Sequence, residues 1–149
     1  MDIYTIGFTK KTAKEFFELL RKNRIKLLVD IRLNNKSQLA AFTKGNDLEF
    51  FLKELCGIEY LHDISLAPTD KILSDYKKNI ITWQQYEEQF IPLLERRNKD
   101  NCLIDRYKDR MDGICFLCSE VTPEHCHRRL VAEFMAENIK SEKVNINHL

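Results

Sequence analysis

Two kinds of hydrophobic pattern alternate along the chain. Short apolar runs with β-branched and aromatic residues are typical of strands, and longer segments with apolar residues every three or four positions are typical of amphipathic helices. The patterns predict strands over 2–8, 26–33, 58–64, 113–120 and 143–149, and helices over 12–23, 46–57, 81–98 and 122–139. Strands and helices therefore alternate from the first predicted element to the last.

This alternation predicts an α/β fold. We expect a single three-layer domain over residues 1–149, with a mainly parallel sheet of about five strands and helices on both faces. The chain has only 4 glycines and 3 prolines and no segment that reads as a linker, so nothing divides it into two domains. In such sheets, ligands bind beyond the carboxyl ends of the strands, near a topological switch point.

Local signals set the expected helix boundaries. Thr12 followed by Glu15 has the spacing of a capping box, which predicts the start of the first helix. Thr122 followed by Pro123 predicts the start of the last helix, because threonine is a good N-cap and proline is favoured at the first helical position.

Composition and charge narrow the classes of function. The chain carries 24 basic and 23 acidic residues, a net charge of +1, so no overall positive field attracts nucleic acid. No apolar run reaches the roughly 20 residues that cross a bilayer, and the N-terminal segment lacks the layout of a signal peptide. We therefore expect a cytoplasmic protein with no membrane contact. Its five cysteines are then expected to be thiols, metal ligands or core residues rather than disulfides. The sequence predicts no oligomeric state.

Most of the reactive chemistry lies in one stretch, "CSEVTPEHCHRR". Cys118 and Glu120 are expected at the end of a strand, and Cys126, His127 and Arg128 in the first turn of the following helix. Unpaired backbone N–H groups and the positive end of the helix dipole favour anions there. A cysteine at that position is expected to have a lowered pKa, especially beside arginine or histidine.

Two other interpretations of this stretch stay open. Cys126 is on the side of the buried stripe that begins with Leu130, so it can be ordinary core filling, as we expect for Cys115 within its strand. A zinc ion is the other alternative, with ligands from Cys118, Cys126 and a histidine. Because neighbouring helical residues diverge by about 100°, joint ligation by Cys126 and His127 is awkward, and no metal or other cofactor is predicted.

Residues from other strands are expected to reach the same end of the sheet. Gly7 ends the first strand, and Asp30 and Arg32 end the second with side chains on one face. Charged residues at the end of an apolar strand require compensation, which either their mutual pairing or a ligand supplies. We therefore predict an anion-binding crevice, with carboxylates for proton transfer, an arginine for an oxyanion and a nucleophilic thiol.

The chain resembles the DUF488 family of small, mostly prokaryotic proteins. "YTIGFT" is similar to the family's "YTIGHS", "LLVDIR" to its "LVDVR", and "CFLCSEVTPEHCHRRLVAEFM" to its most specific segment. The resemblance covers nearly the whole chain and implies a compact α/β domain without implying a reaction. It places the following residues at family motif positions: Gly7, Asp30, Arg32, Cys118, Glu120, Cys126, His127 and Arg128.

The chain departs from the family pattern at two places. Phe8 stands where the family has a histidine, so any role of that histidine is lost. The loop after the second strand offers Lys36 and Gln38 in place of the usual Ser-Arg pair, which removes an arginine clamp from that loop.

Three hypotheses about function follow. The first is an enzyme acting on a phosphate-bearing substrate, a nucleotide or nucleic acid, with Asp30, Glu120, Cys126 and Cys118 as the catalytic groups and Gly7, Arg32, His127 and Arg128 binding the substrate. The second is a non-catalytic module that binds a nucleotide, nucleic acid or protein. The third is a zinc or redox-sensing protein.

Overall fold

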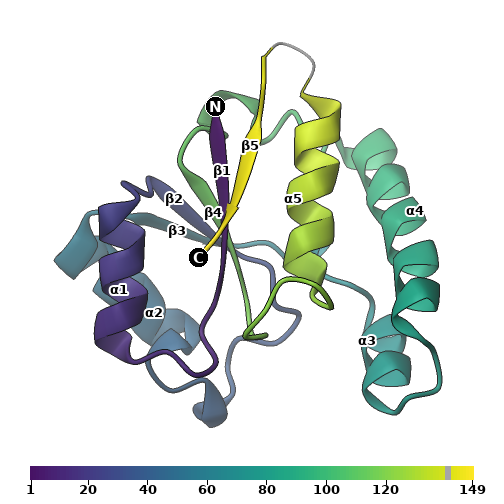
Figure 1. Cartoon of the computed structure of the whole chain (residues 1–149), viewed down its shortest axis with the longest axis horizontal. Helices are drawn as coiled ribbons and strands as arrows, with labels where there is room; N and C mark the ends of the chain where they lie inside the picture. Colours follow the sequence, from purple (N-terminus) through teal and green to yellow (C-terminus); the bar gives the residue numbers. More distant parts are fainter. Residues whose placement is uncertain (140–141) are drawn as a thin grey trace.

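The computed structural model describes residues 1–139 and 142–149, and these residues form one fully parallel sheet (Figure 1). The strands are β1 (Asp2–Gly7), β2 (Leu27–Asp30), β3 (Glu59–His62), β4 (Ile114–Cys118) and β5 (Asn145–His148). Their order across the sheet is β3-β2-β4-β1-β5. The predicted five-stranded parallel sheet is therefore confirmed.

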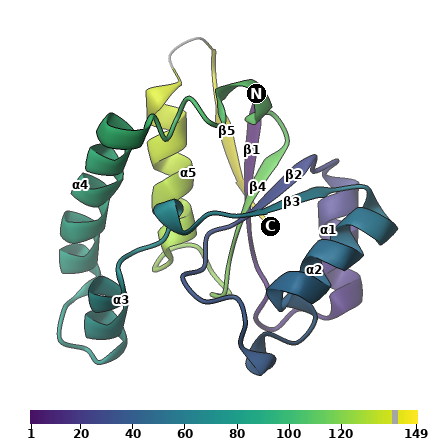
Figure 2. The same ribbon diagram turned by 180° about the vertical axis from the view of Figure 1, so that it is seen from behind.

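Helices cover both faces of this sheet. They are α1 (Ala13–Lys22), α2 (Gly45–Phe51), α3 (Asp70–Lys77), α4 (Trp83–Asn101) and α5 (His127–Asn138), and a π-helical turn over Leu52–Cys56 prolongs α2. α1 and α2 lie on one face, and α3, α4 and α5 lie on the other (Figures 1 and 2). The three-layer α/β architecture is thus confirmed.

Alternate residues of the central strands β2 and β4 enter two separate cores, because successive strand side chains point to opposite faces. Leu28 and Cys115 pack with α1 and α2, whereas Val29 and Phe116 pack with α4 and α5. Cys115 has no exposed surface, which confirms the expected core role.

The position of β4 creates the switch point of the sheet. β4 lies between β1 and β2 and pairs with both, with Cys118 opposite Gly7 and Leu117 opposite Asp30. The chain leaves β1 and β2 toward α1 and α2, but it leaves β4 toward α5 on the other face. The segments that follow β2 and β4 therefore separate at their carboxyl ends, where open α/β sheets bind ligands.

Two helices of the structure differ from what the sequence predicts. α5 begins at His127 rather than Pro123, and Cys126 is its N-cap. The reason is that Arg128 donates hydrogen bonds to the carbonyls of Glu120 and Val121, which hold the preceding segment as a loop over the start of the helix. The second difference is α3, which was not predicted although Thr69 caps it by accepting a hydrogen bond from the Ile72 N–H.

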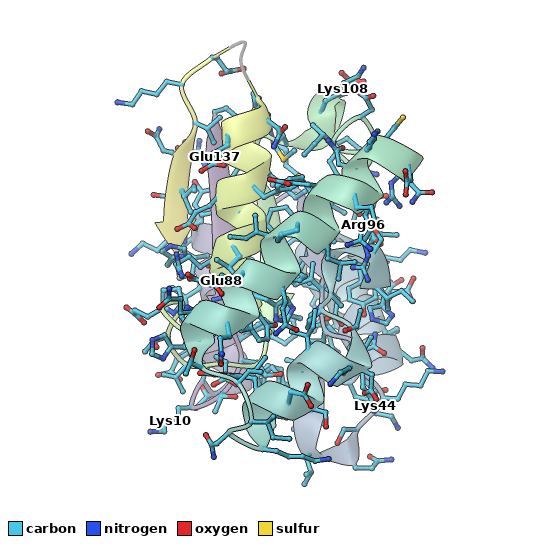
Figure 3. All side chains as sticks on the ribbon, turned by 90° about the vertical axis from the view of Figure 1, so that its right-hand side faces the viewer. Lys10, Lys44, Glu88, Arg96, Lys108 and Glu137 are labelled. Atoms are coloured by element: carbon cyan, nitrogen blue, oxygen red, sulfur yellow. The ribbon has the colours of Figure 1, made fainter. Side chains whose placement is uncertain are left out.

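Charged side chains cover the outer surface of the helices. Figure 3 shows Glu88 and Arg96 on α4 and Glu137 on α5 pointing away from the sheet. Arg97, in contrast, turns inward and donates to the carbonyls of Ser65 and Ala67, so the neighbouring Arg96 and Arg97 do not form one continuous basic surface. Within the described ranges, no helix has both the length and the apolarity needed to cross a bilayer.

The two threonines that the sequence marks as helix caps are expected to differ in their effect on stability. Thr12 forms a complete capping box with Glu15, so Thr12→Ala should lower the free energy of unfolding by about 1 kcal/mol. Thr122 is exposed and precedes the helix by several residues, so Thr122→Ala should cost less than about 0.5 kcal/mol. Urea denaturation of both variants checks this, and an equal loss would contradict the observed start of α5.

Candidate active site at the carboxyl ends of β2 and β4

A cavity of about 370 Å³ lies at the switch point. We call it the switch pocket. Three segments line it: the chain after β2, the region from α3 to the start of α4, and the chain from the end of β4 to the start of α5. Its lining residues are Arg32, Leu33, Asn34, Leu73, Tyr76, Lys77, Asn79, Trp83, Tyr86, Cys118, Ser119, Glu120, His125, Cys126 and His127. A larger hollow beside α1 is lined mainly by exposed lysine, arginine and glutamate side chains and holds no cysteine or histidine.

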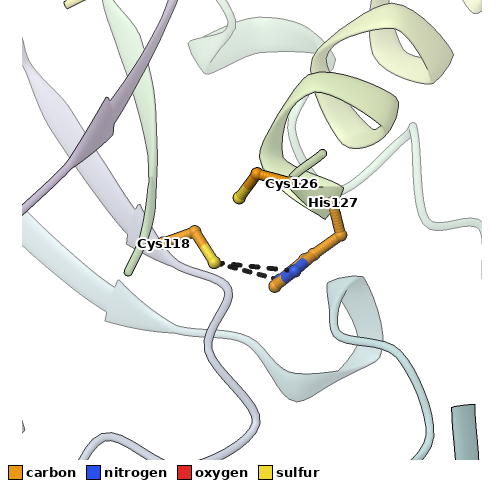
Figure 4. Close-up of side chains that lie close together, drawn as sticks. All are labelled: Cys118, Cys126 and His127. Atoms are coloured by element: carbon orange, nitrogen blue, oxygen red, sulfur yellow. Dashed lines mark hydrogen bonds between the residues drawn. The ribbon is translucent and has the colours of Figure 1, made fainter. Parts of the chain in front are cut away.

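A sulfur–imidazole cluster forms part of the pocket wall. Its members are Cys118, Cys126 and His127, all buried (Figure 4). The Sγ atom of Cys118 lies 3.5 Å from Nδ1 and 3.8 Å from Nε2 of His127. One ligand atom from each of the three residues falls within 4.8 Å of the others, so the cluster has the composition and spacing to hold a metal ion.

The position of Cys126 at the N-cap explains why the cluster can form. Its backbone is extended, with φ −135° and ψ 135°, so it does not follow the helical turn that would direct neighbouring side chains about 100° apart. Cys126 and His127 therefore both face Cys118, at the end of β4. The predicted divergence of these two side chains is therefore wrong, because Cys126 is not helical.

A backbone carbonyl fixes the orientation of the His127 ring. Nε2 of His127 lies 2.8 Å from the carbonyl oxygen of Ile31. A carbonyl only accepts hydrogen bonds, so Nε2 carries the proton and donates it, and Nδ1 is left unprotonated, 3.5 Å from the sulfur of Cys118. The ring thus keeps one unprotonated nitrogen beside the cysteine sulfurs on the pocket wall.

The two thiols of the cluster have opposite pKa shifts. Interaction with the Cys126 thiol lowers the pKa of Cys118, and the backbone N–H groups of Ser119 and Glu120 and the charge of Arg128 act in the same direction against the effect of burial. The same interaction, together with burial, raises the pKa of Cys126. Cys118 is therefore the more acidic of the two thiols, and the lowered pKa that the sequence predicted for a cysteine at the start of this helix is wrong for Cys126.

Arg128 and Gly7 lie behind the cluster rather than in the pocket. Arg128 is fully buried, and its guanidinium donates to the carbonyls of Glu120 and Val121. A Cβ atom on Gly7 would lie 1.7 Å from the Glu120 carbonyl oxygen and 2.5 Å from Nη1 of Arg128. Glycine at this position is therefore required for the loop and the guanidinium to pack against the end of β1.

Asp30 and Arg32 form a closed ion pair. Arg32 donates through Nε and Nη2 to the two carboxylate oxygens of Asp30, at 2.8 and 2.7 Å, and its remaining contacts include Thr43. Tyr60 and Asn35 donate to the same carboxylate. Asp30 has no exposed surface. The pairing that the sequence left open is thus present, and only Arg32 reaches the pocket lining.

Glu120 has a different environment from Asp30. Its side chain is exposed, and the residue lines the switch pocket.

Of the eight residues singled out from the sequence, the structure brings five to the pocket: Arg32, Cys118, Glu120, Cys126 and His127. It places Gly7, Asp30 and Arg128 in the supporting structure behind that wall.

Comparison with known proteins identifies a family. The family model for a domain of unknown function, DUF488, matches residues 12–135. The chain belongs to the DUF488 family. No curated protein and no solved structure matches this DUF488 chain. The match includes the whole sulfur–imidazole cluster and the loop that carries it.

Sequence reasoning missed an aromatic wall of this DUF488 site. Trp83 stacks on Tyr86 with ring centroids 4.7 Å apart and on His125 with centroids 5.4 Å apart, and Tyr76 packs edge-on against Trp83. Lys77 on α3 joins them in the pocket lining. The signal that could have directed attention here was Thr69 before "DKILSDYK", a helix start that would have brought this region to the crevice.

The closed Asp30–Arg32 pair is expected to act on stability. Asp30→Asn leaves a buried guanidinium without its counter-charge, so the free energy of unfolding should fall by about 3 kcal/mol. Glu120→Gln, at an exposed carboxylate, should change it by less than about 0.5 kcal/mol. Urea denaturation measures both, and a neutral Asp30→Asn variant would contradict the structural role of the pair.

Proposed function

We propose that this chain is an enzyme acting on a phosphate-bearing substrate such as a nucleotide, with the switch pocket as its active site. The observation that carries the proposal is the sulfur–imidazole cluster on the wall of a cavity at the switch point of the sheet. Reactive groups with perturbed pKa values inside a concave pocket are typical of active sites rather than of packing.

The start of α5 supports an anionic substrate. Cys126 is the N-cap, but its side chain makes no capping hydrogen bond, so the positive end of this 12-residue helix is not satisfied in the usual way. Cys126 and His127 line the pocket at this helix end. Lys77 adds an exposed cation on the opposite wall. Together they favour a phosphate or another compact anion near the cluster.

The aromatic wall supports a substrate with a flat ring. Trp83 is half-buried, and the exposed ring of His125 stacks on it and extends the aromatic surface. Planar rings bind such surfaces by stacking, with little dependence on their hydrogen-bonding pattern. A nucleotide combines the ring and the phosphate that the two walls favour.

The cluster supplies the reactive groups. Cys118 lies at hydrogen-bonding distance from Nδ1 of His127, and the Ile31 carbonyl orients that imidazole. A nucleophile, a base and a group that orients the base are the parts that nucleophilic catalysis requires. Glu120 at the mouth offers an exposed carboxylate for proton transfer.

Binding can be measured with the protein's own fluorescence. Trp83 is the one tryptophan of the chain, so a nucleoside 5′-monophosphate that enters the pocket should change its emission. Lys77→Ala should weaken this binding about tenfold by removing a charged contact. Lys78→Ala, at the neighbouring exposed residue that does not line the pocket, should leave it unchanged. Equal effects of both variants, or binding of the nucleoside as tightly as its phosphate, would contradict the predicted phosphate contact.

Turnover separates an enzyme from a binding module. Across a panel of nucleotides and short oligonucleotides, Cys118→Ser should lower kcat by at least about 100-fold while binding persists, because the reacting group is lost and the pocket is kept. Cys102→Ser is the matched control, since Cys102 is exposed and outside the pocket. Tight binding of a panel member with no turnover by the unaltered protein would favour the binding module instead.

A further inference from the structure

The sulfur–imidazole cluster has the ligand set of a zinc site with one open position. In a tetrahedral site, Zn–S bonds of about 2.3 Å and Zn–N bonds of about 2.0 Å place a sulfur and a nitrogen ligand about 3.6 Å apart. The Cys118 Sγ and His127 Nδ1 atoms are 3.5 Å apart, and a ligand atom from Cys126 completes a set within 4.8 Å. The same sulfur lies 3.8 Å from Nε2, so it sits over the ring rather than on the axis of the Nδ1 lone pair, and the imidazole must turn for the three side chains to bind one ion.

The surroundings of the ligands match those of a metal site. Histidine ligands of metals usually donate their second ring N–H to a carbonyl or carboxylate, which fixes the ring and its tautomer. His127 does this through Nε2 to the Ile31 carbonyl. The backbone that carries the ligands is also fixed, because Cys118 ends a central strand and Arg128 holds the intervening loop.

The buried charge of Arg128 also favours a metal site with thiolate ligands. Arg128 is fully buried, and in the described part of the chain its hydrogen bonds to oxygen go to neutral carbonyls. Its Nη1 lies 4.0 Å from Sγ of Cys126, and its Nε has no partner. A buried cation without a carboxylate requires negative charge nearby. Thiolate ligands at Cys118 and Cys126 supply that charge.

The ligand set selects the metal and its role. Two sulfurs and one imidazole suit zinc, whereas magnesium and calcium prefer oxygen ligands. Among the described residues, three side chains contribute to this group rather than four. Structural zinc sites use four protein ligands, and catalytic sites use three and keep the fourth position for water or substrate.

We propose that Cys118, Cys126 and His127 bind one Zn²⁺ ion whose fourth coordination position opens into the switch pocket. The ion would lower the pKa of a water molecule bound there and would make Cys118 a ligand rather than a covalent nucleophile. Zinc binding itself does not depend on the proposed function. The part that rests on it is the role of that bound water toward a phosphate-bearing substrate.

The test begins with the reduced, chelator-treated full-length protein, titrated with Zn²⁺ against a chromophoric chelator and, separately, with Co²⁺. We expect one equivalent of either ion to bind, and the Co²⁺ form should show thiolate-to-cobalt charge transfer and the visible bands of a tetrahedral site. Cys118→Ser, Cys126→Ser and His127→Ala should each weaken Zn²⁺ binding by at least about 100-fold. Cys56→Ser and Cys102→Ser, away from the cluster, should bind as the unaltered protein does.

Several results would overturn the proposal. One is binding of less than about 0.2 equivalents of zinc per chain at micromolar protein concentration. Another is a Co²⁺ spectrum without thiolate-to-cobalt charge-transfer bands. A third is a loss of Zn²⁺ binding in the two control variants as large as that in the three cluster variants. The cobalt spectrum of the unaltered protein keeps the test valid even if a buried-site variant fails to fold. Nucleotide turnover by the metal-free protein would overturn the role of the zinc-bound water alone, and zinc binding without nucleotide binding would overturn the proposed function alone.

Discussion

The buried guanidinium of Arg128 is the interaction on which the candidate site depends. It extends from the first turn of α5 to the carbonyls of Glu120 and Val121, which lie just after β4. These bonds fix the path of the loop between the two cysteines, and they require that Gly7 have no side chain. Arg128 thus holds three parts of the fold together: the end of β1, the end of β4 and the start of α5.

The topology of the sheet turns that point into a pocket. β4 is inserted between β1 and β2, and its helix leaves toward the face opposite to that of α1 and α2. The chain after β2 therefore diverges from the chain after β4, and α3 with the start of α4 closes the third side. The closed Asp30–Arg32 pair stabilises the β2 side of this opening and carries Arg32 to its edge. Structural and reactive residues consequently alternate around the same end of the sheet.

The sequence predicted what depends on local pattern. Alternating runs gave the strands, the Thr12 capping box gave a helix start, and Cys115 was correctly expected in the core. Long-range contacts decided the rest. Pro123 carries a good local signal for a helix start, yet the bonds of Arg128 to the loop delay α5 to His127. The sulfur cluster and the aromatic wall also depend on how segments pack across the switch point, which no single stretch of the sequence encodes.

The two buried arginines differ in how their charge is compensated. Arg32 is compensated by the carboxylate of Asp30 at 2.7 Å, whereas the ion pairs of the described residues do not include Arg128. A cation without a counter-charge in a low-dielectric interior is costly. The Sγ atom of Cys126 lies 4.0 Å from Nη1 of Arg128, and the charge of Arg128 contributes to the lowered pKa of Cys118, so the guanidinium that positions the loop also acts on the cluster.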